Sequence, residues 1–228
     1  MINLNDIGGV IDHSLLRPDA TYTDLKRSCD EAHQFGLYAV CIYPCFIRKA
    51  REFLKDTKVR ITAVIGFPLG MTPTEVKVHE AMNASLEGAD ELDIVVNIGA
   101  LKSGDWVAVK RDIADIIMAT KGLIHKTIIE TCYLDTKEKA KVVELAFNAG
   151  SEFIKTSTGF GPDGARVEDI KLIKTIVGDA AGIKAAGGIK TLAQVLHMLK
   201  AGATRIGTSA GVEIVKEWKK NMRKTKSF

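Results

Sequence analysis

The stretch "EFIKTSTGF" (152–160) decides how the chain is interpreted, because an apolar run is interrupted by a lysine before it ends in hydroxyl residues and glycine. Phe153 and Ile154 are typical of a buried β-strand. Lys155 follows them, and a charged amine among apolar neighbours is costly unless it is paired or used. The stretch therefore predicts a buried strand whose lysine forms a structural ion pair or serves the chemistry of a site.

Short runs rich in β-branched residues recur along the chain, and longer runs with helical spacing separate them. The candidate strands are 9–16, 38–44, 59–67, 91–98, 125–131, 152–158, 182–188 and 204–209. This alternation indicates parallel βαβ units, and eight units predict an α/β fold, a single (β/α)8 TIM barrel with a short N-terminal helix. One domain is expected over 1–228, with a basic tail from about residue 219. A doubly wound open sheet is the alternative, but the chain lacks its phosphate-binding glycine motifs.

Capping residues predict where several helices begin. Thr72 is expected as an N-cap, with Pro73 in the first turn and Glu75 completing a capping box. Asp135 or Thr136 is expected to cap a later helix, which a glycine closes. A third helical pattern predicts one inward apolar face, formed by Val107, Ile113, Ile116 and Ile117.

The composition excludes several classes of protein. Hydrophobic residues make up 46% and charged residues 26% of the chain, which is ordinary for a globular domain. The net charge of +4 suits an anionic small molecule but does not predict a nucleic-acid partner. No apolar run is long enough for a membrane span, and the N-terminus does not resemble a signal peptide. Cys41 and Cys45 lack a second ligand pair for zinc, so a cytoplasmic protein without a metal site or cofactor is expected.

Ionisable residues inside the candidate strands mark the candidate site, because barrel enzymes carry their chemistry at the carboxyl ends of strands. Lys155, Lys184, Asp93 and Asp12 each have apolar neighbours. If the first three face inward, two ammonium groups and one carboxylate meet inside the barrel. Lys126 comes early in its strand, so we expect it near the bottom of the barrel in a structural role.

These residue types are sufficient for one kind of chemistry. Burial and a neighbouring ammonium group reduce the basicity of a lysine, and a neutral amine attacks carbonyl compounds to form a Schiff base. The iminium is an electron sink, so the carbon–carbon bond β to its nitrogen can break or form. A carboxylate and a second amine can move the protons. The set predicts a Schiff-base aldolase, and a structural salt bridge is the alternative.

Two glycine-containing segments near the end of the chain predict a phosphate site. Gly187 and Gly188 follow the seventh strand, and Ser209 follows the eighth. Barrels commonly bind phosphate with these two loops, where backbone N–H groups approach the anion closely. Glycine pairs are common in turns, but two segments at the two expected places indicate a phosphorylated aldehyde or sugar as substrate.

Several segments resemble those of the deoxyribose-phosphate aldolase family, in order, from about residue 8 to 218. The segments are "IDHSLL", "AVCIYP", "VIGFPLG", "ELDIVVNIGALKSGDW", "KTIIETCYL", "FIKTSTGF", "GIKAAGGI" and "RIGTSAG". The resemblance implies a metal-free class I aldolase on a (β/α)8 barrel, which reversibly cleaves 2-deoxy-D-ribose 5-phosphate to D-glyceraldehyde 3-phosphate and acetaldehyde. Barrels of this type are often dimers or tetramers, so a homodimer or homotetramer is expected.

The resemblance assigns roles to individual positions. Lys155 matches the Schiff-base lysine, while Asp93 and Lys184 match the proton-transfer residues, of which Lys184 also lowers the pKa of the nucleophile. The positions matching the phosphate-binding loops are Gly187, Gly188, Gly207 and Ser209. The positions matching the substrate pocket are Asp12, Cys41 and Thr158.

The chain departs from the family pattern at a few positions. Ser14 replaces a frequent threonine, and Ala210 replaces a serine of some members, which could remove one phosphate hydrogen bond. The chain ends in Phe228, where some members have a tyrosine thought to assist proton transfer. His13 could touch substrate or form a local structural hydrogen bond. Two other functions stay open, a Schiff-base aldolase or transaldolase for another phosphosugar and a non-catalytic barrel that binds phosphorylated ligands.

Overall fold

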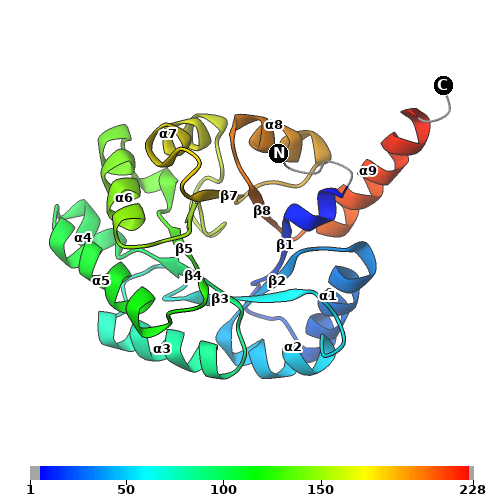
Figure 1. The fold of residues 1–228 in the computed structure, drawn as a ribbon, viewed down its shortest axis with the longest axis horizontal. Helices are drawn as coiled ribbons and strands as arrows, with labels where there is room; N and C mark the ends of the chain where they lie inside the picture. The colour runs from blue at the N-terminus through cyan, green and yellow to red at the C-terminus, as the bar shows by residue number, and fades with distance from the viewer. Residues whose placement is uncertain (1–5, 226–228) are drawn as a thin grey trace.

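Eight strands form a closed ring at the centre of the computed structural model, which describes residues 6–225 (Figure 1). Each strand pairs in parallel with the next along the chain, and β8 returns to β1, where Ile206 lies opposite Ile11. The strands are β1 (Ile11–Leu15), β2 (Ala39–Ile42), β3 (Arg60–Ile65), β4 (Glu91–Val95), β5 (Ile124–Ile128), β6 (Phe153–Lys155), β7 (Gly182–Ala186) and β8 (Arg205–Thr208). The predicted (β/α)8 barrel is confirmed, and the open sheet is excluded.

Helices alternate with the strands and cover the outside of the ring (Figure 1). They are α1 (Tyr22–Phe35), α2 (Ile47–Phe53), α3 (Thr74–Leu86), α4 (Ile98–Lys102), α5 (Trp106–Ala119), α6 (Thr136–Asn148), α7 (Val167–Val177), α8 (Leu192–Ala201) and α9 (Gly211–Thr225). A 3₁₀ helix, Ile7–Val10, is the short N-terminal helix. None of the helices in the described part of the chain is long and apolar enough to cross a membrane. The described part of the basic tail, residues 219–225, forms the end of α9 and points away from the ring (Figure 1), and Phe228 lies outside the described residues.

Strand β6 is shorter than its sequence pattern predicts. The apolar and β-branched pattern extends over 152–158, but the strand ends at Lys155. The next residue, Thr156, bonds to β7 through its side chain. Its hydroxyl donates to the carbonyl of Ala186 and accepts from the backbone N–H of Ala186. Lys155 is therefore the last strand residue, at the carboxyl end where barrels carry their active sites.

The N-terminus of α3 differs from the predicted capping box. The helix begins at Thr74, and Pro73 occupies the N-cap position in an extended conformation without a side-chain cap. The prediction of Thr72 as N-cap was wrong because Thr74 ends up inside the helix, where its hydroxyl donates to Asp112 of α5 at 2.9 Å. At α6 the predicted cap is confirmed: Asp135 accepts the backbone N–H three residues on.

The apolar face of α5 differs from the prediction at one position. Ile113 and Ile116 are fully buried, whereas Val107 is 80% exposed. Val109 takes the inward place instead. Two residues along an α-helix correspond to about 200° of rotation, so Val107 points away from the barrel when Val109 points toward it.

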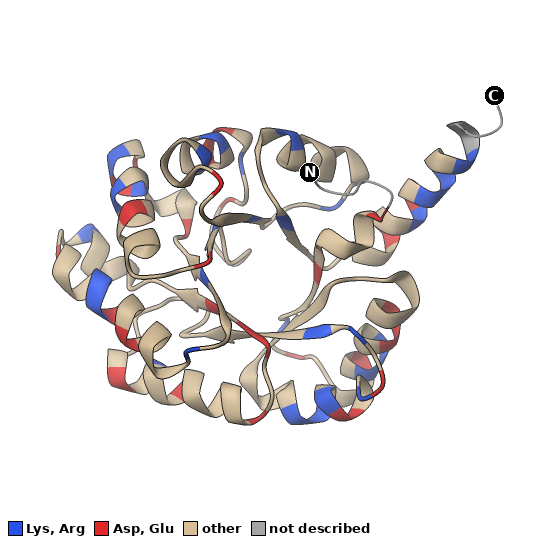
Figure 2. Cartoon of the chain, in the orientation of Figure 1, with Lys and Arg blue, Asp and Glu red and all other residues tan. Residues whose placement is uncertain are grey.

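The inside and the outside of the ring differ in chemistry. Apolar side chains such as Ile61, Leu92 and Ile154 fill the layer between strands and helices and are fully buried. The ring also carries buried charged side chains, namely Asp12, Glu91, Asp93, Lys126, Lys155, Lys184 and Arg205. Figure 2 shows acidic and basic residues on the strands of the ring as well as on the outer helices. Branched apolar residues usually fill the centre of such barrels, so this centre is unusual.

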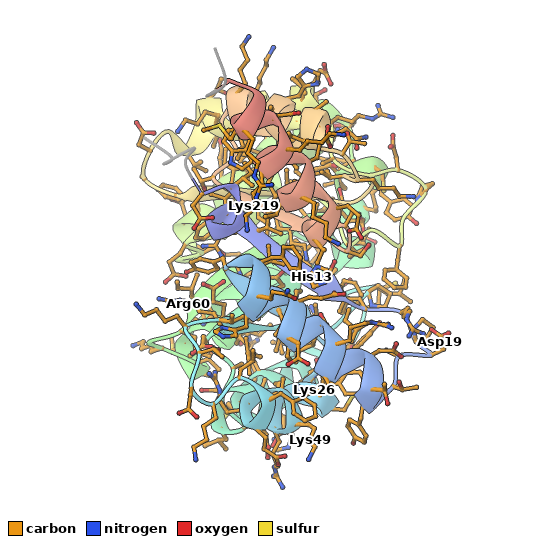
Figure 3. The ribbon with its side chains drawn as sticks, turned by 90° about the vertical axis from the view of Figure 1, so that its right-hand side faces the viewer. His13, Asp19, Lys26, Lys49, Arg60 and Lys219 are labelled. Carbon is orange, nitrogen blue, oxygen red and sulfur yellow. The ribbon has the colours of Figure 1, made fainter. Side chains whose placement is uncertain are left out.

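The two ends of the barrel can be told apart in a side view. Figure 3 places Asp19, in the loop after β1, and Arg60, at the start of β3, on opposite sides of the molecule. Since all the strands are parallel, their carboxyl ends lie on the side of Asp19. The loops on that side surround the candidate site.

Candidate active site

Asp93 lies at the centre of a cluster of three lysines from three other strands. Its Oδ2 accepts from the ammonium groups of Lys155 and Lys184, at 2.7 and 2.8 Å. Its Oδ1 accepts from Lys126 at 2.7 Å. Strands β4 to β7 are consecutive neighbours in the ring, and one inward residue from each meets here. The structure thus brings together the three residues predicted to be catalytic.

A second group of charges lies directly beneath this cluster. Asp12 of β1 pairs with Lys184 and, at 2.9 Å, with Arg205 of β8. Glu91 of β4 pairs with Lys126 at 2.7 Å and with Arg205 at 3.4 Å. Lys126 therefore bridges the lower charges and Asp93, and it contacts the candidate site more directly than its place in the sequence predicted.

The charges fix the protonation of several groups. Burial by itself would raise the pKa of Asp93, but the three surrounding ammonium groups outweigh it and hold that pKa well below the usual 3.8. Burial would also raise the pKa of Asp12. The positive charges of Lys184 and Arg205 outweigh this effect and lower the pKa of Asp12 to about 2. Burial would lower the pKa of Lys184, but the carboxylates of Asp12 and Asp93 raise it above its usual 10.5. Lys184 and both aspartates are therefore ionised at neutral pH.

A cavity of about 550 Å³ opens next to this charged centre. Its inner wall is formed by Cys41, Lys155, Thr158 and Lys184. The thiol of Cys41 lies 3.8 Å from Oδ2 of Asp93, and burial raises the pKa of this thiol. Among the residues described, the cavity lining includes neither Asp93 nor Asp12. The two lysines thus stand between the cavity and the carboxylates.

The loops after β7 and β8, where the sequence predicts phosphate binding, form another part of the cavity wall. Gly187, Gly188, Gly207 and Ser209 all line the cavity. Gly188 has a φ of 75°, and a Cβ there would meet no atom within 4 Å, so its backbone is open to the cavity. Gly207 has another role, because a Cβ there would lie 3.0 Å from Cε of Lys184. Its missing side chain makes room for that lysine.

Sequence reasoning missed several residues of this region. Glu91 and Arg205 stand at the first positions of their strands and resembled surface charges, although both are buried. Lys190, two residues after the glycine pair, lines the cavity and supplies a positive charge there. Glu130 is buried behind the wall of the cavity. It is the first ionisable residue after the fifth strand in "HKTIIET", which is the signal that could have found it.

His13 faces outward from β1 and is not part of the charged cluster. Figure 3 shows it between α1 and α9. Its Nε2 lies 3.1 Å from Oε2 of Glu31 on α1. The local structural hydrogen bond is therefore the better of the two interpretations of His13, although this residue is also among those that line the cavity.

A closed barrel with amines and carboxylates at the carboxyl ends of its strands is the architecture of a barrel enzyme. The family model described as DeoC/LacD family aldolase matches residues 8–217, and the chain therefore belongs to this family of aldolases, which are lyases. The resemblance predicted from the motifs is thus confirmed.

Individual relatives match nearly the whole chain. The deoxyribose-phosphate aldolase of Thermococcus gammatolerans is 56% identical over 214 residues, which cover 92% of this chain and 95% of that protein. The solved structure titled "QR15, an Aldolase" has a TM-score of 0.92 at 40% identity and covers 97% of this chain and 98% of its own. The deoxyribose phosphate aldolase of Aeropyrum pernix, titled as a unique tetrameric structure, has a TM-score of 0.89 at 32% identity, covering 96% and 93%.

Proposed function

We propose that this chain reversibly cleaves 2-deoxy-D-ribose 5-phosphate to D-glyceraldehyde 3-phosphate and acetaldehyde through a Schiff base on Lys155. The single observation that carries the proposal is the position of Lys155, the last residue of β6, on the cavity wall and 2.7 Å from Asp93. Membership of the aldolase family and the name of the 56% identical relative support the choice of reaction and substrate.

Lys155 suits the role of nucleophile better than the other two lysines. Lys126 is fully buried and bound to the carboxylates of Glu91 and Asp93. Lys184 is also fully buried and is held by two carboxylates that favour its charged form. Lys155 borders the cavity and, unlike Lys184, contacts one carboxylate, so its ammonium group can give a proton to Asp93 and the resulting neutral amine can attack the aldehyde carbon.

We infer that Asp93 and Lys184 move the protons of the reaction. After the nitrogen of Lys155 adds to C1, the carbinolamine must lose water, and one oxygen of Asp93 touches both ammonium groups. Cleavage of the C2–C3 bond releases D-glyceraldehyde 3-phosphate as the C3 hydroxyl loses its proton, and the electrons move into the iminium to form an enamine. Protonation at C2 and hydrolysis then free acetaldehyde and Lys155. General acid–base help of this kind contributes about 10²–10⁴-fold per step.

The phosphate group would lie at the loops after β7 and β8. Gly187 and Gly188 present backbone N–H groups there, next to the hydroxyl of Ser209 and the ammonium of Lys190. In this orientation the sugar chain runs from Lys155 across Thr158 toward the glycine pair. The chemistry of these residues needs no metal ion or organic cofactor, so none is proposed.

Covalent trapping tests the proposal. The protein is incubated with acetaldehyde and sodium borohydride, digested, and the reduced adduct is located by mass spectrometry. An adduct on Lys155 that disappears in Lys155→Ala is the expected result, with turnover of 2-deoxyribose 5-phosphate lost in the same variant. An adduct on another lysine, or phosphate binding without any adduct, contradicts the assignment. A panel of phosphosugars then tells this aldolase from one that acts on another sugar.

The oligomeric state follows as a second part of the proposal. We propose a homodimer or homotetramer, supported by the tetrameric title of the Aeropyrum pernix relative. Light scattering coupled to size exclusion measures the mass directly, and a single species of 24.8 kDa would contradict it.

We propose a cytoplasmic location. The four cysteines are unpaired in the described residues, and two of them, Cys29 and Cys41, are buried, which is typical of a reducing compartment. Fractionation of the source cells followed by immunoblotting tests this location, and recovery in the extracytoplasmic fraction would contradict it.

A further inference from the structure

Glu130 is a buried carboxylate in an unusual backbone conformation. It follows β5 by two residues and has a φ of 50°, the one positive φ outside glycine in the described chain. Its side chain is almost fully buried, and among the side chains that the structure describes, those of residues 6–223, no lysine, arginine or histidine lies at ion-pairing distance from it. Strained backbone and an unpaired buried carboxylate each cost free energy, so this position is a candidate for a role in the reaction.

The carboxylate of Glu130 is directed at one residue of the cavity wall. The backbone N–H of Thr158 donates to both of its oxygens, each at 3.2 Å, and the Thr158 hydroxyl donates to Oε2. The loop packs closely over this contact, because a Cβ on Gly161 would lie 3.4 Å from the Glu130 carboxylate. Glu130 therefore holds Thr158 by three hydrogen bonds.

The hydrogen bonds of the Thr158 hydroxyl can be counted in full. A hydroxyl has one proton to donate and two lone pairs that accept. The proton is given to Glu130, and one lone pair accepts the backbone N–H of Phe160 at 3.0 Å. One lone pair is left, and Thr158 borders the cavity. The hydroxyl can therefore accept a hydrogen bond from a ligand but has no proton left to donate to one.

We propose that Glu130 is a positioning residue that makes Thr158 an acceptor for a hydroxyl group of the substrate. The inference rests on the proposed function. Thr158 lines the same cavity as Lys155, which would hold C1, and as the glycine pair, which would hold the phosphate. Its neighbour Gly159 already approaches Gly187, because a Cβ added to Gly159 would lie 3.8 Å from the Cα of Gly187. The hydroxyl nearest the phosphate is the one on C4, which is the C2 hydroxyl of D-glyceraldehyde 3-phosphate.

Glu130→Gln tests whether Glu130 sets the direction of the hydrogen bonds of the Thr158 hydroxyl, because the two side chains have nearly the same shape. The amide nitrogen that replaces one carboxylate oxygen donates instead of accepting, so Thr158 would turn its proton toward the cavity. We measure kcat/KM for addition of acetaldehyde to D-glyceraldehyde 3-phosphate and to 3-phosphooxypropanal, which lacks the C2 hydroxyl. The variant should lose about 10- to 100-fold with the first acceptor and less than about twofold with the second. Glu144→Gln, an exposed change on α6, is the matched control and should alter neither value.

Thr158→Val gives an independent measurement, because it removes the hydroxyl at nearly constant volume. This variant should lose kcat/KM with D-glyceraldehyde 3-phosphate but not with 3-phosphooxypropanal. The double variant with Glu130→Gln should show no larger difference between the two acceptors than Thr158→Val alone. Equal losses with both acceptors in either variant, or additive losses in the double variant, overturn the inference. If Glu130→Gln does not fold, Glu130→Asp takes its place, because its shorter side chain draws the carboxylate away from the Thr158 hydroxyl and should cause the same discrimination.

Borohydride trapping separates this inference from the proposed function. Acetaldehyde has no hydroxyl group, so Glu130→Gln should trap it on Lys155 as the unchanged protein does. If the unchanged protein forms no adduct, the proposed function fails. If trapping is intact and the variants do not discriminate between the acceptors, only the role of Glu130 is overturned.

Discussion

Asp93 is the residue on which the charged centre depends. One carboxylate accepts from three ammonium groups, and each of its oxygens is occupied. The same contact that holds Lys155 in place also offers it a proton acceptor. Removing Asp93 changes both the position of Lys155 and its proton acceptor, so these two effects cannot be measured separately in that way. Both can be measured separately from phosphate binding at the loops after β7 and β8.

Asp93→Asn should lower kcat by about 10²–10⁴-fold, because the amide cannot take up a proton. Affinity for inorganic phosphate, measured by calorimetry, should change little, since Asp93 does not line the cavity in which Gly187 and Gly188 would hold phosphate. Ser209→Ala is the comparison, and there KM should rise while kcat stays within a few-fold. A kcat within tenfold of the unchanged protein in Asp93→Asn would rule out a proton-transfer role.

The residues of the centre differ in how far the sequence could predict them. Lys155, Lys184 and Asp93 interrupt apolar strands, and alternation assigns their faces. Arg205 and Glu91 stand at strand starts, where charges are common, so nothing local marks them as buried. The contact of Lys126 with Asp93 depends on the register between β4 and β5, and register is a property of paired strands rather than of one stretch of sequence.

At the level of single elements, helix boundaries depend on capping hydrogen bonds. A sequence pattern can fit such a bond without the bond being formed. "TPTE" and "DTKE" both fit a capping box, yet only the second forms one. In the first, Thr74 bonds across to α5 and Pro73 takes the cap position. Packing of α3 against α5 thus decides where α3 begins. Strand existence, by contrast, follows from local periodicity, and all eight predicted strands are present.

Asp135→Ala should destabilise the protein by about 1 kcal/mol through loss of the α6 cap. For a chain of this size that corresponds to a decrease in Tm of about 2–4 °C. Thr72→Ala, which removes a hydroxyl that fits the capping pattern but caps no helix, should leave Tm unchanged. Thermal unfolding followed by circular dichroism measures both. Equal decreases in the two variants would contradict the assignment of the caps.

The pair of Lys77 and Asp112 joins α3 to α5 out of contact with water. The two side chains are 2.6 Å apart and nearly fully buried, and Lys77 also donates to the carbonyl of Val95 at 2.8 Å. Lys77→Met should therefore lower the free energy of unfolding by about 3–5 kcal/mol, because it leaves a buried carboxylate unpaired. Lys49→Met removes an exposed pair with Glu52 and should cost no more than about 1 kcal/mol. Urea titrations compare the two, and similar losses would contradict the prediction.

For the whole molecule, stability should decrease in acid in two stages. Burial lowers the pKa of His125 below its usual 6.5, so the unfolded chain binds this proton more readily and stability falls as the pH drops below about 6.5. Asp12 has a folded-state pKa of about 2 against the usual 3.8. Its contribution, on the order of 2 kcal/mol, is complete above pH 4 and is lost between about pH 4 and 2.

Urea unfolding at a series of pH values measures both stages. His125→Asn should abolish the slope that begins below about pH 6.5 and leave the loss below pH 4 in place. A slope that persists in this variant would show that another group titrates there. Stability that is constant down to pH 2 would contradict the charged state of Asp12 and Asp93 in the fold.

The filling of the barrel with ions has a thermal consequence. The free energy of hydration of a charged group becomes less favourable as water is heated, so keeping four cationic and three anionic side chains out of water costs less at higher temperature. Aliphatic side chains gain nothing comparable, since hydrophobic stabilisation levels off. Heating therefore weakens the outer apolar layer of this barrel sooner than its centre, and the side chains that would carry out the chemistry are also those best suited to keep the strands together when the protein is hot.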